Sequence, residues 1–237
     1  MSESTSPLPV FDFAQVLPPF GFELPTRMSA LPLAPGRVAL ISPVPIDDAL
    51  ATRIAALGEV AYLIAPNLLH HMYMGDALRR YPSARVLGPR GLRAKRPDLR
   101  LDLTLEEPLP EELTRAVDVR LIAGAPALSE FAFFHRATRT LVVTDLVFNI
   151  EQPRGWFAHL LFSLAGTRKR LAASRAIRFM IKDRARFSAS LQEILALPFE
   201  NLVMAHGSVV RVEARARLAQ AFSWLSPERL ALPASTT

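Results

Sequence analysis

The stretch Ile64-Ala-Pro-Asn-Leu-Leu-His-His-Met-Tyr-Met-Gly75 carries two of the five histidines of this chain, directly after an apolar run. The run Val60-Ala-Tyr-Leu-Ile64, closed by a Pro-Asn pair, predicts a buried strand that ends in a loop. Side chains at the C-terminal end of a buried strand converge on one point more readily than side chains on a helix surface. His70 and His71 are therefore candidate metal or substrate ligands. The alternative is that they cap or pack against the helix predicted over 72–81.

Two further strands are predicted to end in a side chain that can bind metal. Asp145 follows Thr140-Leu-Val-Val-Thr144, and His206 follows Asn201-Leu-Val-Met-Ala205. Imidazole and carboxylate are ordinary ligands of zinc, iron and manganese. With the histidine pair, these residues bring the usual coordination number of four within reach.

The length and composition indicate one α/β domain. A chain of 237 residues can cover about 70 to 75% of its unfolded surface, and half of its residues are apolar, which excludes extensive disorder. The absence of cysteine excludes disulfides, thiolate ligands and a cysteine nucleophile. The first residues lack the pattern of a secretory signal, and no apolar run reaches the roughly 18 residues of a membrane span. We therefore expect a cytoplasmic protein.

The net charge of +6 raises the question of a nucleic-acid partner. The positive residues are almost all arginine, and no zinc-finger pattern, glycine-rich phosphate loop or aromatic RNA-binding signature accompanies them. We expect no specific nucleic-acid partner and a small-molecule substrate of unknown identity. The sequence leaves the oligomeric state open.

Three regions are distinguished along the chain. Residues 1–35 are rich in proline and predict an extended arm over the domain, with an edge strand at Val10-Phe-Asp-Phe13. Residues 36–226 alternate strands and helices, and residues 227–237 are predicted to form a flexible tail. The predicted strands are 37–41, 60–64, 85–87, 117–122, 130–135, 140–144 and 201–205, and the predicted helices begin near 47, 72 and 212.

The segment 151–186 is basic and is predicted to be helical. A basic amphipathic helix is a candidate for binding a membrane surface. The alternative is a helix that covers the sheet with its arginines in solvent. The sequence favours this alternative, because basic residues also recur elsewhere in the chain.

Three motifs carry a family resemblance. Val143-Thr-Asp-Leu-Val-Phe148 is similar to a Thr-Gly-Asp-Leu-Phe segment, Ala205-His-Gly207 to a Gly-His-Gly segment, and Pro66-Asn-Leu-Leu-His-His71 to a His-x-His-x-Asp-His loop. Together they resemble the metallo-β-lactamase superfamily, specifically an uncharacterised bacterial branch with degenerate metal motifs. The resemblance implies an αββα sandwich of two mixed β-sheets flanked by helices, with metal ligands on loops at one edge and hydrolytic chemistry.

The departures from the family pattern fall in one half of its metal centre. Pro66 and Leu68 stand where the first two histidines would be, His70 stands where the aspartate would be, and Ala125 replaces a histidine in the turn after residue 122. The resemblance therefore implies one reduced site for a single divalent ion, zinc or else iron or manganese. Its implied ligands are His70, His71, Asp145 and His206, with His70 and Asp145 as the catalytic candidates.

Two residues are expected to orient these ligands through hydrogen bonds without binding the metal themselves. Glu130 begins an apolar strand, where its carboxylate would orient a ligating imidazole or, alternatively, face water, and Asn67 lies in the histidine loop. His135, at the end of the same strand, is expected to be exposed. The leading function is a metal-dependent hydrolase. The alternative is a non-catalytic binding or structural module of the same fold without a metal.

Overall fold

The larger of two main sheets has six strands. The computed structural model describes residues 7–17 and 22–225. The strands are, in spatial and chain order, β1 (Val10–Leu17), β2 (Phe22–Ala34), β3 (Arg37–Ile41), β4 (Glu59–Ile64), β5 (Arg85–Gly88) and β6 (Leu103–Thr104). The pairs β1–β2 and β2–β3 are antiparallel, and the strands from β3 to β6 are parallel. This sheet is therefore mixed.

The second main sheet has four strands in the order β12 (Asn201–Val203), β9 (Thr140–Val142), β8 (Phe131–His135) and β7 (Val117–Leu121). Strand β12 is parallel to β9, and the other two pairs are antiparallel. A short ribbon, β10 (Phe148–Asn149) with β11 (Leu171–Ala172), stands apart from both sheets.

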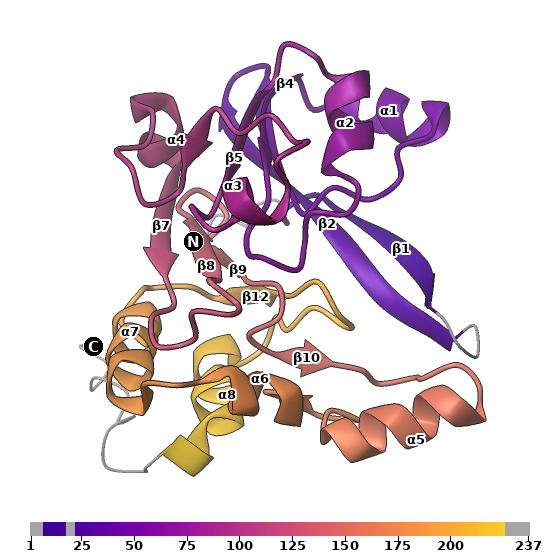
Figure 1. The fold of residues 1–237 in the computed structure, drawn as a ribbon, viewed down its shortest axis with the longest axis vertical. Helices are drawn as coiled ribbons and strands as arrows, with labels where there is room; N and C mark the ends of the chain where they lie inside the picture. Colours follow the sequence, from indigo (N-terminus) through magenta and orange to yellow (C-terminus); the bar gives the residue numbers. More distant parts are fainter. Residues whose placement is uncertain (1–6, 18–21, 226–237) are drawn as a thin grey trace, which may run out of the picture.

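The two sheets pack face to face, with helices on both outer faces (Figure 1). In β3, Val38 and Leu40 face the helices, while Ala39 and Ile41 face the other sheet, as the two-residue period of a strand requires. The helices α1 (Asp48–Ala55), α2 (Met74–Arg80) and α3 (Leu92–Lys95) cover the first sheet. The second sheet is covered by α6 (Arg175–Met180), α7 (Arg184–Leu195), α8 (Ala214–Ala221) and η1 (Ser223–Leu225). The predicted αββα sandwich is confirmed.

The expected N-terminal arm is corrected by this structure. Residues 10–17 and 22–34 are strands of the six-stranded sheet, so a boundary at residue 35 falls inside the turn between β2 and β3. The prolines misled the prediction because the sheet accommodates them: Pro32 lies at a register shift, where a missing N–H is tolerated. The edge strand expected at 10–13 is present as β1. Residues 1–6 and 18–21 and the predicted tail at 227–237 lie outside the described residues.

The remaining helices lie at the margins of the sandwich. Helix α4 (Glu111–Ala116) precedes β7, and α5 (Trp156–Ala165) lies in the segment predicted to be basic and helical. Helix α7, capped by the Asp183 carboxylate at the N–H of Arg186, was not predicted as a separate element. Within the described part of the chain, no helix is long and apolar enough to span a bilayer.

Candidate metal centre

Three loops at one edge of the sandwich bring three side chains together. His70 follows β4, Asp145 follows β9, and His206 follows β12. The Nε2 atom of His70 lies 3.2 Å from Nε2 of His206 and 3.3 Å from Oδ2 of Asp145. The Nε2 atom of His206 lies 3.3 Å from Oδ1 of Asp145. Within the described residues, these are the three His, Asp or Glu side chains whose ligand atoms cluster closely enough to hold one metal ion.

The second nitrogen of each imidazole has a protein partner. Nδ1 of His206 is 2.7 Å from the carbonyl oxygen of Pro25, and because a carbonyl only accepts, this nitrogen carries the proton. Nδ1 of His70 is 2.7 Å from Oγ of Ser42. With its Nδ1 proton held in this way, His206 presents Nε2 to the cluster, and in the neutral imidazole this is the nitrogen that would bind a metal ion.

The backbone around His206 is tightly constrained. Gly207 has a φ of +104°, and a Cβ at this position would lie 2.1 Å from the carbonyl oxygen of Asn149. A side chain there would be strained and would collide with the backbone, so glycine is required. The ring of Phe148 stacks on the His206 imidazole at 4.8 Å between centroids. These two contacts hold His206 in one orientation.

Asn67 connects the histidine loop to Asp145. Its side-chain nitrogen donates to Oδ2 of Asp145 at 2.7 Å and to Oγ1 of Thr144 at 2.9 Å. Its side-chain oxygen accepts from the backbone N–H groups of Leu69 and His70. One fully buried amide therefore sets the position of two of the three cluster residues.

Glu130 holds the backbone of the aspartate. It is fully buried, and its two carboxylate oxygens accept from the N–H groups of Thr144 and Asp145 at 2.7 and 3.0 Å. The expected alternative, a carboxylate facing water, is wrong, and its partners are these N–H groups rather than an imidazole. Burial, together with the charge of Asp145, raises the pKa of Glu130 to about 7, against the effect of its N–H donors.

The cluster favours positive charge between its members. Burial by itself would raise the pKa of Asp145, but the charges and hydrogen bonds of His70 and His206 outweigh it and hold that pKa well below its ordinary value. Burial opposes protonation of His70, and the Asp145 carboxylate outweighs this and raises the pKa of His70. A buried carboxylate between two imidazoles is stabilised by a cation, whether a proton or a metal ion.

His71, the predicted fourth ligand, does not belong to the cluster. Its Nδ1 lies 3.1 Å from a guanidinium nitrogen of Arg96, and burial followed by the charges of Lys95 and Arg96 lowers its pKa. The loop turns between adjacent residues, so His70 faces inward and His71 faces α3. The candidate set is therefore three residues, His70, Asp145 and His206, rather than the four that were predicted.

The half of the family's metal centre that the sequence lacks is filled by apolar packing. Leu68 lies over Gly91, and its N–H donates to the carbonyl oxygen of Leu128 at 2.9 Å. Ala125 is buried in the same core cluster as Leu128. The positions of the missing histidines are therefore part of the hydrophobic core or its margin.

Three placements differ from the sequence analysis. Ser42 was missed, although it follows the strand β3 and obeys the strand-end rule that identified the other residues. The carbonyl of Pro25 was also missed, and no side-chain signal could have indicated it. His135, expected to be exposed, is buried, and its Nε2 donates to the carbonyl of Pro32 on β2 at 2.8 Å.

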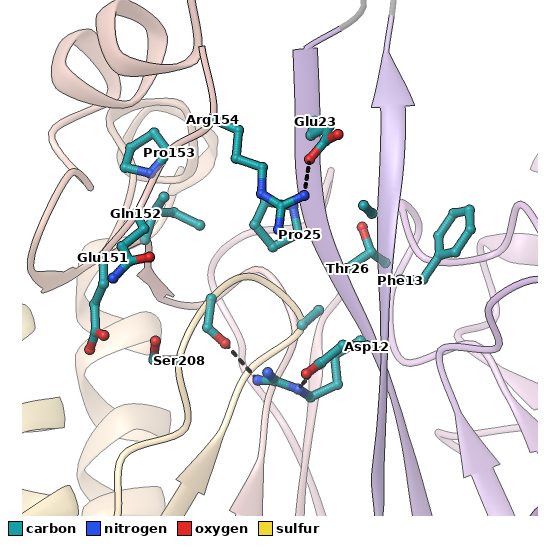
Figure 2. Close-up of a pocket in the computed structure, with 15 residues that line it drawn as sticks. Asp12, Phe13, Glu23, Pro25, Thr26, Glu151, Gln152, Pro153, Arg154 and Ser208 are labelled. Carbon is teal, nitrogen blue, oxygen red and sulfur yellow. Dashed lines mark hydrogen bonds and ion pairs between the residues drawn. The ribbon is translucent and has the colours of Figure 1, made fainter.

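A groove of about 510 Å³ lies next to the cluster, between the β1–β2 hairpin and the loop 151–154 (Figure 2). An ion pair of 3.2 Å between Arg154 and Glu23 spans it. Pro25 and Gly207 are shared between the groove wall and the surroundings of His206. The three cluster residues are not among the lining residues, and the side chains of His70, Asp145 and His206 are only 9%, 7% and 4% exposed.

Buried Arg27 ties the hairpin to the His206 loop. Its guanidinium donates to Asp12 at 2.6 Å on β1 and to the carbonyls of Met204 and Gly207 at 3.1 and 2.6 Å. The N-terminal strands are thereby part of the support of the cluster.

Comparison with solved structures identifies the fold. The chain is similar to the metallo-β-lactamase DIM-1 (12% identity, TM-score 0.60, 94% of this chain and 100% of that one) and to a metallo-β-lactamase from Pontibacter korlensis (13% identity, TM-score 0.59, 91% and 94%). It is also similar to the metal-soaked Flv1 flavodiiron core from Synechocystis sp. PCC6803 (14% identity, TM-score 0.58, 91% and 58%). No protein-family model and no curated protein matches the chain. The chain has the metallo-β-lactamase fold, in a form highly divergent in sequence.

Proposed function

We propose that this protein binds one divalent metal ion through His70, Asp145 and His206 and acts as a metal-dependent hydrolase. The observation that carries the proposal is that the two Nε2 atoms lie 3.2 Å apart and that each lies 3.3 Å from an oxygen of Asp145, Oδ2 for His70 and Oδ1 for His206. In a tetrahedral site with metal–nitrogen bonds of 2.0 to 2.1 Å, neighbouring ligand atoms lie about 3.3 Å apart. The observed separations are close to this value and support a metal ion bound by the three residues.

The donor set is chemically suited to this role. Two imidazoles and one carboxylate are an ordinary set for zinc hydrolases and for non-haem iron, so zinc, iron and manganese are all candidates. When bound at such a set, a divalent ion polarises a substrate oxygen and makes water a better nucleophile at neutral pH.

The chain's own residues would prepare the ligands. The Pro25 carbonyl fixes the His206 tautomer, Ser42 orients His70, and Asn67 orients Asp145. As a ligand, His70 is not available to transfer protons. The same holds for Asp145, which is a ligand as well and whose lowered pKa makes it a poor proton acceptor, so proton acceptance falls to a group outside the three ligands.

A non-catalytic role of the same fold is the second candidate. The observation that favours it is the low exposure of the three side chains, together with their absence from the adjacent groove. Under this alternative the fold serves as a binding or structural module, and the cluster has no catalytic part in it. Asp145→Ala would then leave the cellular function intact.

The decisive experiment is elemental analysis of untagged protein grown with zinc, iron and manganese. Wild type should contain about one metal ion per chain, and His206→Ala and Asp145→Asn should reduce this content at least about ten-fold, because each removes a ligand. The matched control is His71→Ala, which removes the neighbouring imidazole outside the cluster and should retain the metal. A wild type without metal, or equal loss in the control, would contradict the proposal.

Activity is tested separately on the metal-loaded protein. Esters, lactones, phosphodiesters and thioesters form the first panel, because all have a centre that an activated water can attack. Hydrolysis by wild type and not by Asp145→Asn would support a hydrolase. Stoichiometric metal without turnover of any of these classes would favour the non-catalytic role.

A further inference from the structure

The positive charge of the chain is concentrated in one segment. Residues 152–182 contain seven lysines and arginines and no acidic residue, whereas the net charge of the whole chain is +6. The seven cations are Arg154, Arg168, Lys169, Arg170, Arg175, Arg178 and Lys182. The remainder of the chain is therefore close to neutral, and a general bias toward arginine does not account for the distribution.

These cations have fewer acidic partners than the arginines in the rest of the described chain, of which some, such as Arg53 and Arg85, also lack an ion pair. Elsewhere, arginines such as Arg37 and Arg120 form ion pairs with neighbouring carboxylates. In the segment, Arg154 pairs with Glu23, and none of the other six cations forms an ion pair with any described residue. Six unneutralised cations indicate a surface that attracts an anionic partner.

The same segment exposes large apolar side chains. On α5, Trp156, Leu160 and Leu164 are 74%, 49% and 59% exposed, and on α6, Phe179 is 79% exposed. The three α5 residues are spaced four apart and form one stripe on the outer side of the helix. The inner side is also apolar, because Ala158 and Phe162 are buried. A helix that is apolar on both sides normally has a partner on each.

The apolar stripe and the cations are contiguous. Arg175 donates to the carbonyl oxygen of Leu164 at 3.0 Å, and it precedes Phe179 by four residues on α6. Lys182 lies over the ring of Phe179 at 4.6 Å. Both helices lie at the same end of the molecule (Figure 1). The exposed apolar groups are thus bordered directly by positive charge.

The basic border continues into a pocket. Lys169, Arg170, Arg178 and Arg217 line a cavity of about 440 Å³ that has no acidic side chain among its lining residues. The guanidinium of Arg178 lies over the Trp224 ring, and its Nε has no hydrogen-bond partner among the described residues. A buried donor without a partner is unfavourable and suits an anionic oxygen.

We propose that α5, α6 and the segment between them form a docking surface for an anionic lipid bilayer. The side chains of Trp156, Leu160, Leu164 and Phe179 would enter the interface, and the six cations would contact lipid phosphates. Apolar side chains beside clustered lysines and arginines are the usual composition of a helix that lies on such a membrane. A protein partner or a second copy would match the apolar stripe but would need a complementary acidic surface. The proposal does not depend on the metal centre.

The test is co-sedimentation with vesicles of phosphatidylcholine alone and of phosphatidylcholine with about 30% phosphatidylglycerol. Wild type should bind the anionic vesicles at least about ten-fold more strongly, and raising NaCl from about 0.1 M to about 1 M should abolish the difference by screening. In Trp224→Phe, the remaining tryptophan is Trp156, and its emission should shift to shorter wavelength on the anionic vesicles.

Two sets of variants separate the apolar and charged contributions. Trp156→Ser/Leu164→Ser/Phe179→Ser and Arg168→Gln/Lys169→Gln/Arg175→Gln should each lower binding about ten-fold or more. Their controls are Leu121→Ser/Val212→Ser, which removes exposed apolar groups elsewhere, and Arg79→Gln/Arg90→Gln/Arg93→Gln, which removes the same charge near α2 and α3. The controls should bind like wild type, and circular dichroism should be unchanged in all variants.

Three results would overturn the proposal. The first is equal binding of wild type to both kinds of vesicle, and the second is no binding to either. The third is a dimer in light scattering that the apolar variant converts to a monomer, which would assign this surface to a second copy of the chain.

Discussion

The two ends of strand β8 both hold a buried titratable residue, and they are built differently. Glu130 directly precedes the strand and His135 ends it. At the Glu130 end, two imidazole Nε2 atoms and a carboxylate converge on one point. At the His135 end, Nδ1 and Nε2 are 2.8 Å from the Thr138 hydroxyl and the Pro32 carbonyl. Burial is therefore shared by His135 and the candidate ligands, and the difference is that Nε2 of His70 and of His206 faces other cluster residues, whereas Nε2 of His135 faces a carbonyl.

Glu130→Ala should have the largest effect, a loss of stability that originates at the Glu130 end of β8. The substitution leaves the buried N–H groups of Thr144 and Asp145 without an acceptor, and each unpaired group costs about 1 to 3 kcal/mol. We expect the free energy of unfolding to fall by about 3 kcal/mol in urea denaturation. Glu130→Gln, which keeps one acceptor, is the matched control and should lose less. Equal stability of wild type and Glu130→Ala would contradict this account.

Ser42→Ala should have an intermediate effect, confined to the proposed metal centre. It removes the oxygen that orients His70, and loss of such a support lowers metal affinity about 10- to 100-fold. Competition with a chromophoric chelator measures the affinity. Thr138→Ala removes the hydroxyl from His135 at the other end of β8 and should leave metal affinity unchanged. Similar losses in the two variants would show that the two ends are not distinct.

The smallest effect concerns pH at the His135 end. Burial lowers the pKa of His135, and its hydrogen bond to Pro32 only partly offsets this. Between this lowered pKa and the ordinary value near 6.5, the unfolded chain binds more protons than the folded one, so stability falls as pH decreases through that window. From pH 7.5 to 5.5, wild type should lose on the order of 1 kcal/mol more than His135→Gln. Parallel profiles of the two proteins would contradict the sign argument.

Much of the fold was predictable because its local patterns are strong. The strands near 37–41, 60–64, 85–87 and 140–144 appear close to their predicted positions, since short apolar runs closed by glycine, proline or polar residues have few alternatives. The prediction of an N-terminal arm was wrong because proline content was treated as a local signal. Whether proline is tolerated depends instead on the pairing of β2 with β3 and on the bulge between them. Helix α7 was missed because a basic segment before it obscured its start.

For the candidate site, the sequence identified the residues but not the direction in which each side chain points. His70 and His71 are chemically identical and adjacent, and the family motif favoured His71 as a ligand. In the structure, the side-chain oxygen of Asn67 accepts from the N–H of His70, whose side chain points inward. The ring of His71 lies against the guanidinium of Arg96 instead. No periodicity or spacing reports which of two neighbouring side chains faces the core when both lie in a loop.

The αββα arrangement was implied by the family resemblance. The sequence by itself determined the α/β class, the placement of His70, Asp145 and His206 at strand ends, and the concentration of positive charge after residue 151. These properties follow from hydrophobic periodicity and composition, which act locally along the chain. The tertiary structure alone decided that the Pro25 carbonyl supports His206 and that the Pro32 carbonyl accepts from His135. It also decided that six of the seven cations in residues 152–182 lack an acidic partner among the described residues. The two hydrogen bonds join residues that are distant in sequence, and the lack of ion pairs depends on which distant residues lie near the cations. Both are decided only when the sheets have packed.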